Sequence, residues 1–104
     1  MKITGIECVE ILEGLKLISN TKMSANLAYR ISKTKRNLVD ELNILQDLAK
    51  DYVDKNNQIT DVEKYNEVWA TVLEVDVAKI SLNDITFDVE PSALDMILKI
   101  LEEE

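Results

Sequence analysis

One helical pattern, between about residues 24 and 54, constrains the fold of this chain more than any other feature. Apolar residues recur there at steps of three and four, which places them along one side of an α-helix. This stripe consists of Leu27, Ile31, Leu38, Leu42, Leu45, Ala49 and Tyr52. Thr34 is a polar interruption in it, and Ser24 stands before it as a candidate N-cap. The spacing predicts one long helix that buries a single face against a core or a partner helix.

Two shorter helices are predicted on either side of the long one. Thr4 and Glu7 have the spacing of a capping box, and a helix from about residue 5 to 18 follows them. Its apolar face consists of Cys8, Ile11, Leu12, Leu15 and Ile18. Thr60 and Glu63 form a second capping box before a helix that ends near residue 73. A short polar loop separates this helix from the long one, which favours an antiparallel helical hairpin.

After the third predicted helix the apolar period changes from about 3.6 to about 2. Apolar and polar residues alternate over residues 75–77 and again over residues 85–89, and residues 81–84 carry turn chemistry. We therefore expect a small β-hairpin, to which residues 1–3 could add a strand. Such a hairpin must pack on the helices, because two isolated strands are barely stable.

A last helix is predicted to begin at Pro91, since proline is favoured in the first turn. Its apolar face consists of Leu94, Ile97, Leu98 and Leu101. Three glutamates, residues 102–104, follow at its negative end, where fraying is expected. The fold class is therefore mainly α (α+β): an antiparallel helical hairpin with additional N- and C-terminal helices and a small β-hairpin. A chain of 104 residues fits a single domain, residues 1–104.

The residue inventory argues against catalysis. The chain has no histidine and one cysteine, which removes His-based acid–base chemistry and most zinc sites. Cys8 shares a face with Leu12 and Leu15, so it is interpreted as a core residue. Gly5 and Gly14 are too far apart for a phosphate-binding loop. We predict no enzyme activity, no cofactor and no metal site.

Net charge and hydropathy indicate which partners and which cellular location to expect. The net charge of −8 opposes approach to nucleic acid phosphates. No more than three apolar residues occur in a row, so no membrane span is predicted. A single cysteine forms no intrachain disulfide, and the predicted location is the cytoplasm.

The first half of the long helix is basic. Residues 23–36 include four basic residues and no acidic one, a local charge of +4. The basic residues are Arg30, Lys33, Lys35 and Arg36. Tyr29 lies with Arg30, Lys33 and Arg36 away from the apolar stripe, an arrangement that could contact RNA or DNA phosphates. We favour a solvated surface instead, because the charge of the whole chain opposes phosphate binding.

The second half of the same helix is acidic. Residues 37–54 contain five acidic residues and one lysine, a local charge of −4. Two copies of the helix laid antiparallel would match opposite charges, which suggests a homo-oligomer. Ile44 and Leu48 lie off the main stripe, so the helix has a second apolar side. Either the first or last helix of the same chain covers that side, or a partner does.

Several segments follow one another in a recognisable order. Residues 27–33 open a long charged helix, Lys-Tyr-Asn stands at residues 64–66, Glu-Val-Asp-Val at residues 74–77, and a proline-led helix closes the chain. This order, over about residues 8–101, resembles a family of small uncharacterised proteins of bacteriophages and prophages of Gram-positive bacteria. The chain departs from that family in its short loop at residues 54–61 and in Glu-Pro, where Ser-Pro is usual. The resemblance implies a viral gene product in a bacterial host, and no activity, cofactor or binding residue.

The resulting hypothesis is a non-catalytic phage or prophage protein that acts through protein–protein contacts, as an accessory or chaperone factor in virion morphogenesis. It would work in the host cytoplasm or with the virion. The candidate contact residues are Tyr29, Arg30, Lys33, Arg36, Ile44 and Leu48. The alternative is a nucleic-acid-associated regulator that uses the basic half of the long helix.

Overall fold

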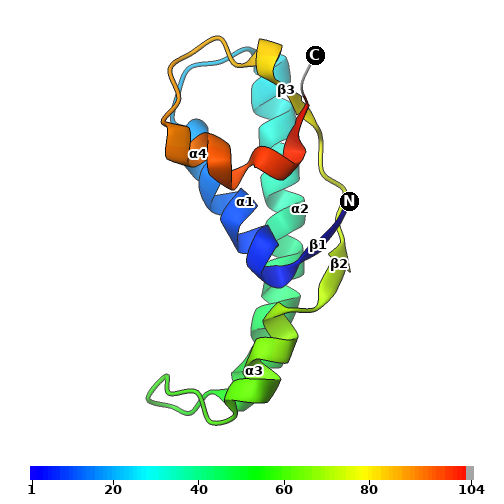
Figure 1. Cartoon of the computed structure of the whole chain (residues 1–104), viewed down its shortest axis with the longest axis vertical. Helices are drawn as coiled ribbons and strands as arrows, with labels where there is room; N and C mark the ends of the chain where they lie inside the picture. Colours follow the sequence, from blue (N-terminus) through cyan, green and yellow to red (C-terminus); the bar gives the residue numbers. More distant parts are fainter. Residues whose placement is uncertain (103–104) are drawn as a thin grey trace.

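A long helix, α2 (Ala25–Ala49), forms the spine of the molecule in the computed structural model (Figure 1). The structure describes residues 1–102, so Glu103 and Glu104 of the predicted tail lie outside the described residues. The molecule measures 45 × 25 × 21 Å, and a 25-residue helix is about 37 Å long, so α2 spans most of the long axis. Four α-helices and a few short strands in the described part confirm the mainly α (α+β) class.

Helix α1 (Gly5–Ile18) has the predicted bounds and the predicted capping box. The Thr4 hydroxyl accepts a hydrogen bond from the Glu7 N–H at 3.2 Å, and a Glu7 carboxylate oxygen accepts one from the Thr4 N–H at 2.9 Å. The predicted apolar face is buried as expected: Cys8, Ile11, Leu12, Leu15 and Ile18. Helix α1 packs against α2 and also against the last helix of the chain.

Helix α2 begins at the predicted cap, where the Ser24 hydroxyl accepts a hydrogen bond from the Leu27 N–H at 3.2 Å. The regular helix ends at Ala49 and continues as a 3-10 turn, η1 (Lys50–Tyr52), slightly before the predicted end. The buried stripe is Leu27, Ile31, Thr34, Leu38, Leu42, Leu45 and Ala49. Tyr52, the last residue of the predicted stripe, lies in η1 and is only partly buried. The long pattern in the sequence therefore marks the core-facing side of one helix.

Helix α3 (Val62–Trp69) lies beside the lower end of α2 in Figure 1 and forms the predicted hairpin with it. Its N-cap is Asp61, whose carboxylate accepts a hydrogen bond from the Lys64 N–H at 3.1 Å, and the predicted capping box at Thr60 is wrong by one residue. The helix also ends earlier than predicted, because residues 72–74 leave it to form a strand.

The strands pair differently from the predicted hairpin. Strand β1 (Lys2–Thr4) pairs antiparallel with β2 (Val72–Glu74), with Ile3 opposite Leu73. Strand β3 (Ile80–Ser81) pairs in parallel with β4 (Leu101–Glu102). Both predicted strands, residues 75–77 and 85–89, are irregular, and a 3-10 turn, η2 (Leu82–Asp84), precedes the second. Its alternating pattern has another cause: Ile85, Phe87 and Val89 pack against the core without a partner strand.

Helix α4 (Pro91–Met96) begins at the predicted proline and crosses α1 (Figure 1). It ends earlier than predicted, because Ile97, at φ −104° and ψ 12°, leaves the helical conformation before a 3-10 turn, η3 (Leu98–Ile100). That change turns Ile100 into the core and leaves Leu98 64% exposed. The prediction that Leu98 belongs to the buried face was therefore wrong.

Two glycines allow close contacts between helices. A Cβ at Gly14 of α1 would lie 2.6 Å from Cγ2 of Ile97 and 2.8 Å from Cβ of Met96, so only glycine lets α4 approach this closely. A Cβ at Gly5 would lie 2.6 Å from Cδ1 of Leu45 and 2.9 Å from the carbonyl oxygen of Trp69. Both glycines thus fix how α1 meets its neighbours.

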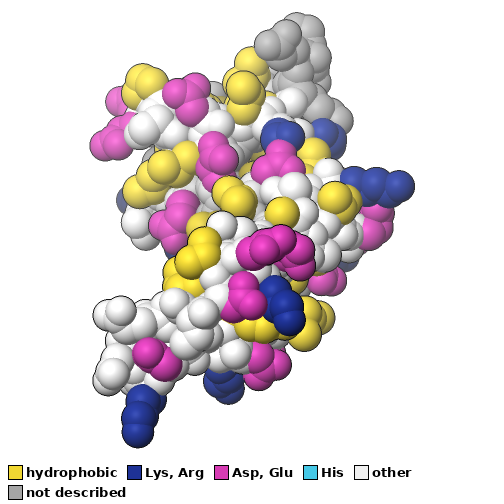
Figure 2. Space-filling model, turned by 60° about the horizontal axis from the view of Figure 1, so that its bottom comes forward, with side chains coloured by type: hydrophobic (Ala, Val, Ile, Leu, Met, Phe, Trp, Pro, Cys, Tyr) yellow, Lys and Arg dark blue, Asp and Glu magenta, His cyan; other side chains and the backbone are white. Residues whose placement is uncertain are grey.

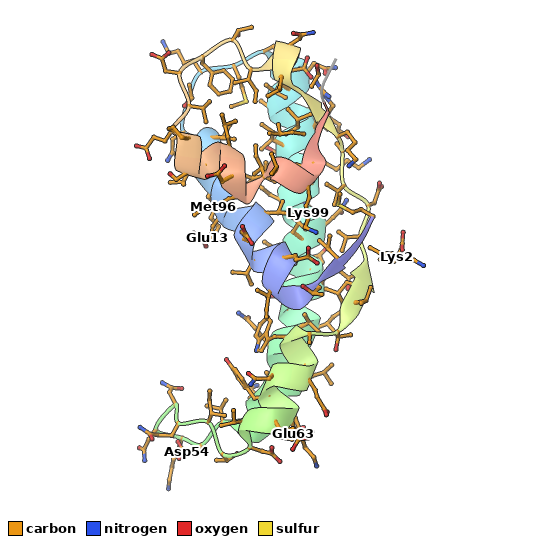
Figure 3. The ribbon with its side chains drawn as sticks, viewed as in Figure 1. Lys2, Glu13, Asp54, Glu63, Met96 and Lys99 are labelled. Atoms are coloured by element: carbon orange, nitrogen blue, oxygen red, sulfur yellow. The ribbon has the colours of Figure 1, made fainter. Side chains whose placement is uncertain are left out.

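An ion pair joins the first turn of α1 to η3 near the end of the chain. The Lys99 ammonium pairs with the Glu7 carboxylate, and Figure 3 shows Lys99 beside the first turns of α1. This pairing, with the hydrogen bond from Thr4, lowers the pKa of Glu7 below its usual value. A lowered folded-state pKa gives stability that is present above the unfolded pKa and is lost as the pH falls through the folded value.

Replacing Lys99 with Met is therefore expected to destabilise the protein at neutral pH. Below about pH 4 this destabilisation should become progressively smaller, because Glu7 becomes protonated and no longer pairs with Lys99. Urea denaturation of both proteins between about pH 3 and pH 7 measures the difference. Lys2→Met is the control, because Lys2 projects away from α1 in Figure 3 and makes no ion pair among the described residues. A Lys99→Met effect that stays constant across this pH range would contradict the assignment.

Candidate functional site

The outward side of α2 carries three large apolar residues that keep more than half of their surface exposed. Tyr29 is 67% exposed, Ile44 55% and Leu48 54%. The prediction that α2 has a second apolar side is therefore confirmed. Ile44 and Leu48 keep more than half of their surface exposed, so the intrachain contact with the first or last helix does not bury this side. The apolar part of this side remains available to a partner.

Arg30 differs from the other basic residues of α2 because it holds the chain together. Its Nη2 donates to an Asp84 carboxylate oxygen at 2.9 Å, its Nη1 to the Lys79 carbonyl at 3.2 Å and its Nε to Asn26 at 3.0 Å. The guanidinium lowers the pKa of Asp84. The proposed contact role of Arg30 is thus weakened, since its guanidinium is used within the chain.

Two further side chains of α2 fasten the segment before β3. The Thr34 hydroxyl accepts a hydrogen bond from the Ala78 N–H at 3.1 Å, and the Asn37 amide donates to the Asp76 carbonyl at 2.9 Å. Thr34 is 3% exposed, so this bond explains how a polar residue is accommodated in the buried stripe.

The basic surface of α2 is smaller than the sequence suggested. Lys35 donates to the Ser19 hydroxyl at 3.2 Å, which directs it toward the end of α1. Lys33 and Arg36 are exposed. Tyr29 and Lys33 border a shallow hollow of about 180 Å³ between α2 and residues 76–78. The exposed basic group therefore consists of Lys33 and Arg36, with Tyr29 beside them.

A second exposed apolar surface lies between α1 and α3 and was not found from the sequence. Its lining residues are Ile6, Val9, Glu10, Tyr65 and Trp69, around a shallow, open groove of about 390 Å³. Ile6 is 61% and Val9 40% exposed. Figure 2 turns the α3 end of the molecule forward and shows hydrophobic side chains there in separate groups among charged ones. The sequence signal for this surface is the pair Ile6 and Val9, which the helical period places on the side of α1 away from its buried face.

Cys8 is a core residue, as predicted. It is fully buried, and its Sγ donates to the Leu38 carbonyl at 3.7 Å. Burial, with a smaller contribution from the Glu41 charge, raises the pKa of the Cys8 thiol to about 11. The thiolate, which is the reactive form, is therefore scarce at neutral pH.

Residues 1–102 contain no group of three or more Asp, Glu, Cys or His side chains arranged to hold a metal ion. None of the helices in that part of the chain has the length and apolarity that crossing a bilayer requires. Comparisons with protein-family models, curated proteins and solved structures found no match to this chain.

Proposed function

We propose that this chain is a non-catalytic phage or prophage protein that acts through protein–protein contacts, as an accessory or chaperone factor in virion morphogenesis. The uncovered outward side of α2, with Tyr29, Ile44 and Leu48 exposed, is the observation that supports a contact role. The viral setting and the host cytoplasm are supported by the sequence resemblance alone.

The mechanism proposed for this surface is antiparallel pairing of α2 with α2 of a second copy. Lys33 and Arg36 lie toward one end of the helix, and Asp40 and Asp47 lie toward the other. Antiparallel pairing brings each basic half against an acidic half, and two-fold symmetry repeats the contact. The exposed ring of Tyr29 would then approach the apolar end of the partner helix at Leu48.

Sedimentation at protomer concentrations from about 10 to 500 μM tests this pairing. We expect a dimer that dissociates on dilution, and we expect Ile44→Ser with Leu48→Ser to shift it to monomer. Two double variants test the charge pairing: Lys33→Asp/Arg36→Asp and Asp40→Lys/Asp47→Lys. Each is expected to stay monomeric alone, because antiparallel pairing would bring like charges together. A mixture of the two is expected to form a heterodimer, because opposite charges then face each other. A wild-type chain that stays monomeric at the highest concentration would remove self-association from the proposal.

Affinity capture from infected or lysogenic host cells tests the wider contact role. We expect wild-type protein to retain a virion assembly protein and the Ile44→Ser/Leu48→Ser variant to lose it. Equal capture by both proteins would mean that the outward side of α2 is not the contact surface.

A second candidate is a nucleic-acid-associated regulator, favoured by the exposed basic pair Lys33 and Arg36 beside Tyr29. The engagement of Arg30 and Lys35 within the chain leaves few phosphate contacts for it. A salt titration distinguishes the two functions: RNA or DNA affinity that falls steeply with salt and is lost in Lys33→Glu/Arg36→Glu supports the regulator. Binding that is undetectable at moderate salt removes it.

A further inference from the structure

The shallow groove between α1 and α3 is an exposed apolar surface, built from residues that the proposed pairing of α2 does not use. Helix α1 contributes two aliphatic side chains, Ile6 and Val9, and helix α3 contributes two aromatic rings, Tyr65 and Trp69. The groove is shallow and open to solvent, with a volume of about 390 Å³, which suits the surface of a partner protein better than an enclosed small molecule.

The aromatic wall has a defined geometry. The Tyr65 and Trp69 rings meet edge to face at 60°, with centroids 6.3 Å apart. Trp69 also lies close to the start of α1, because a Cβ at Gly5 would be 3.2 Å from its Cε3 atom. The indole Nε1 is buried and has no hydrogen-bond acceptor among the described residues. Packing, rather than a polar contact, therefore positions this ring.

The only charged residue that lines the groove is acidic. Glu10 makes no ion pair within residues 1–102, whereas its neighbour Glu13 pairs with Lys16 at 3.7 Å. Aromatic faces and an unpaired carboxylate both attract a cation. The net charge of −8 also attracts positively charged partners at longer range.

We infer that this groove binds a basic amphipathic helix of a partner protein. Aliphatic side chains on one face of that helix would fill the space between Val9 and Trp69, and a flanking Lys or Arg would pair with Glu10. Ile6 is 61% exposed at this groove, so a helix laid on it would cover apolar surface that a small molecule would leave in water. The inference is independent of the α2 pairing, because the two surfaces share no residue and each is tested by its own experiment.

The single tryptophan of the chain, Trp69, reports on occupancy of the groove. The probe is a 14-residue helical peptide with Leu at steps of three and four and Lys at the flanking positions, and its matched twin carries Glu in place of Lys. We expect the basic peptide to shift Trp69 emission to the blue and to bind about tenfold more tightly than the acidic twin. Equal binding of both peptides, or an emission spectrum that neither peptide changes, would overturn the inference.

Variants separate a specific contact from general attraction between opposite charges. Glu10→Lys is expected to weaken binding of the basic peptide about threefold more than Asp88→Lys, which changes the net charge equally but is exposed in the irregular segment after η2, outside both proposed surfaces. Val9→Ser is expected to weaken binding of the basic peptide, whereas Leu82→Ser, at a 44% exposed residue of η2 outside both proposed surfaces, leaves its affinity unchanged. Circular dichroism verifies that each variant is folded.

Three other outcomes would also overturn the inference. The first is an equal effect of Glu10→Lys and Asp88→Lys on affinity for the basic peptide. The second is an apolar dye that occupies the groove and is not displaced by the peptide, which would indicate a small-molecule site. The third is a loss of self-association in Val9→Ser, which would assign the groove to a second copy of this chain.

Discussion

Replacing Leu38 with Ala is expected to lower the free energy of unfolding by about 2–5 kcal/mol. Leu38 is 0% exposed at the middle of α2, and its carbonyl contacts Cys8 of α1, so the shortened side chain would leave a cavity at the centre of the core. A domain of this size has about 5–15 kcal/mol of total stability, so the loss is a large share of it. Urea denaturation followed by circular dichroism measures the change.

Val39→Ala is the matched control for that substitution. Val39 is the next residue of the same helix but is 38% exposed, so its truncation is expected to change stability by only about 0.5 kcal/mol. Comparable losses of unfolding free energy in Leu38→Ala and Val39→Ala would contradict the assignment of the Leu38 side of α2 to the core.

Replacing Gly14 with Val is expected to cost about 1–3 kcal/mol and to push α4 away from α1. The cost arises because a Cβ at this position meets Ile97, Met96 and the Ala93 carbonyl oxygen, at 2.6, 2.8 and 3.1 Å. The higher helix propensity of valine offsets only about 0.5 kcal/mol of it. Thermal or urea denaturation measures the net effect.

A double-mutant cycle tests whether the contact with Ile97 is the cause. The Ile97→Ala background removes Cγ2, so Gly14→Val should cost at least about 0.5 kcal/mol less there than in the wild type. Glu13→Val, at a side chain that is 57% exposed on the same helix, should be tolerated far better than Gly14→Val. Additive costs for Gly14→Val and Ile97→Ala would contradict the proposed clash.

The helices could be predicted from the sequence because their signals are local. Thr4 with Glu7, Ser24 and Pro91 each marks a helix start within one turn of the chain, and the structure has helices at all three places. The side of α2 that is buried follows directly from the spacing of its apolar residues.

The strand pairing could not be predicted because it depends on contacts between distant segments. Alternation over residues 85–89 indicates which side chains face inward, and a loop packed on a core produces the same pattern as a strand. Residues 72–74 follow the apolar period of α3, but pairing with β1 draws them into a strand. Tertiary contact thus overrides a local preference in both cases.

The candidate surfaces were predictable to different degrees. Ile44 and Leu48 could be identified because they fall off the buried stripe of a long helix. Arg30 was assigned to an outward basic stripe, since its partner, Asp84, is far away in the sequence. The groove at Trp69 requires α1 and α3 to be placed side by side, which no local pattern specifies.

The pairing of β1 with β2 has a consequence for how the chain folds. Lys2 lies opposite Glu74, so most of the polypeptide must be gathered into a closed loop before this pair can form. The hairpin of α2 and α3 involves only neighbours in the sequence and needs no such closure. We therefore expect these two helices to associate early in refolding, and attachment of the first strand to set the overall folding rate.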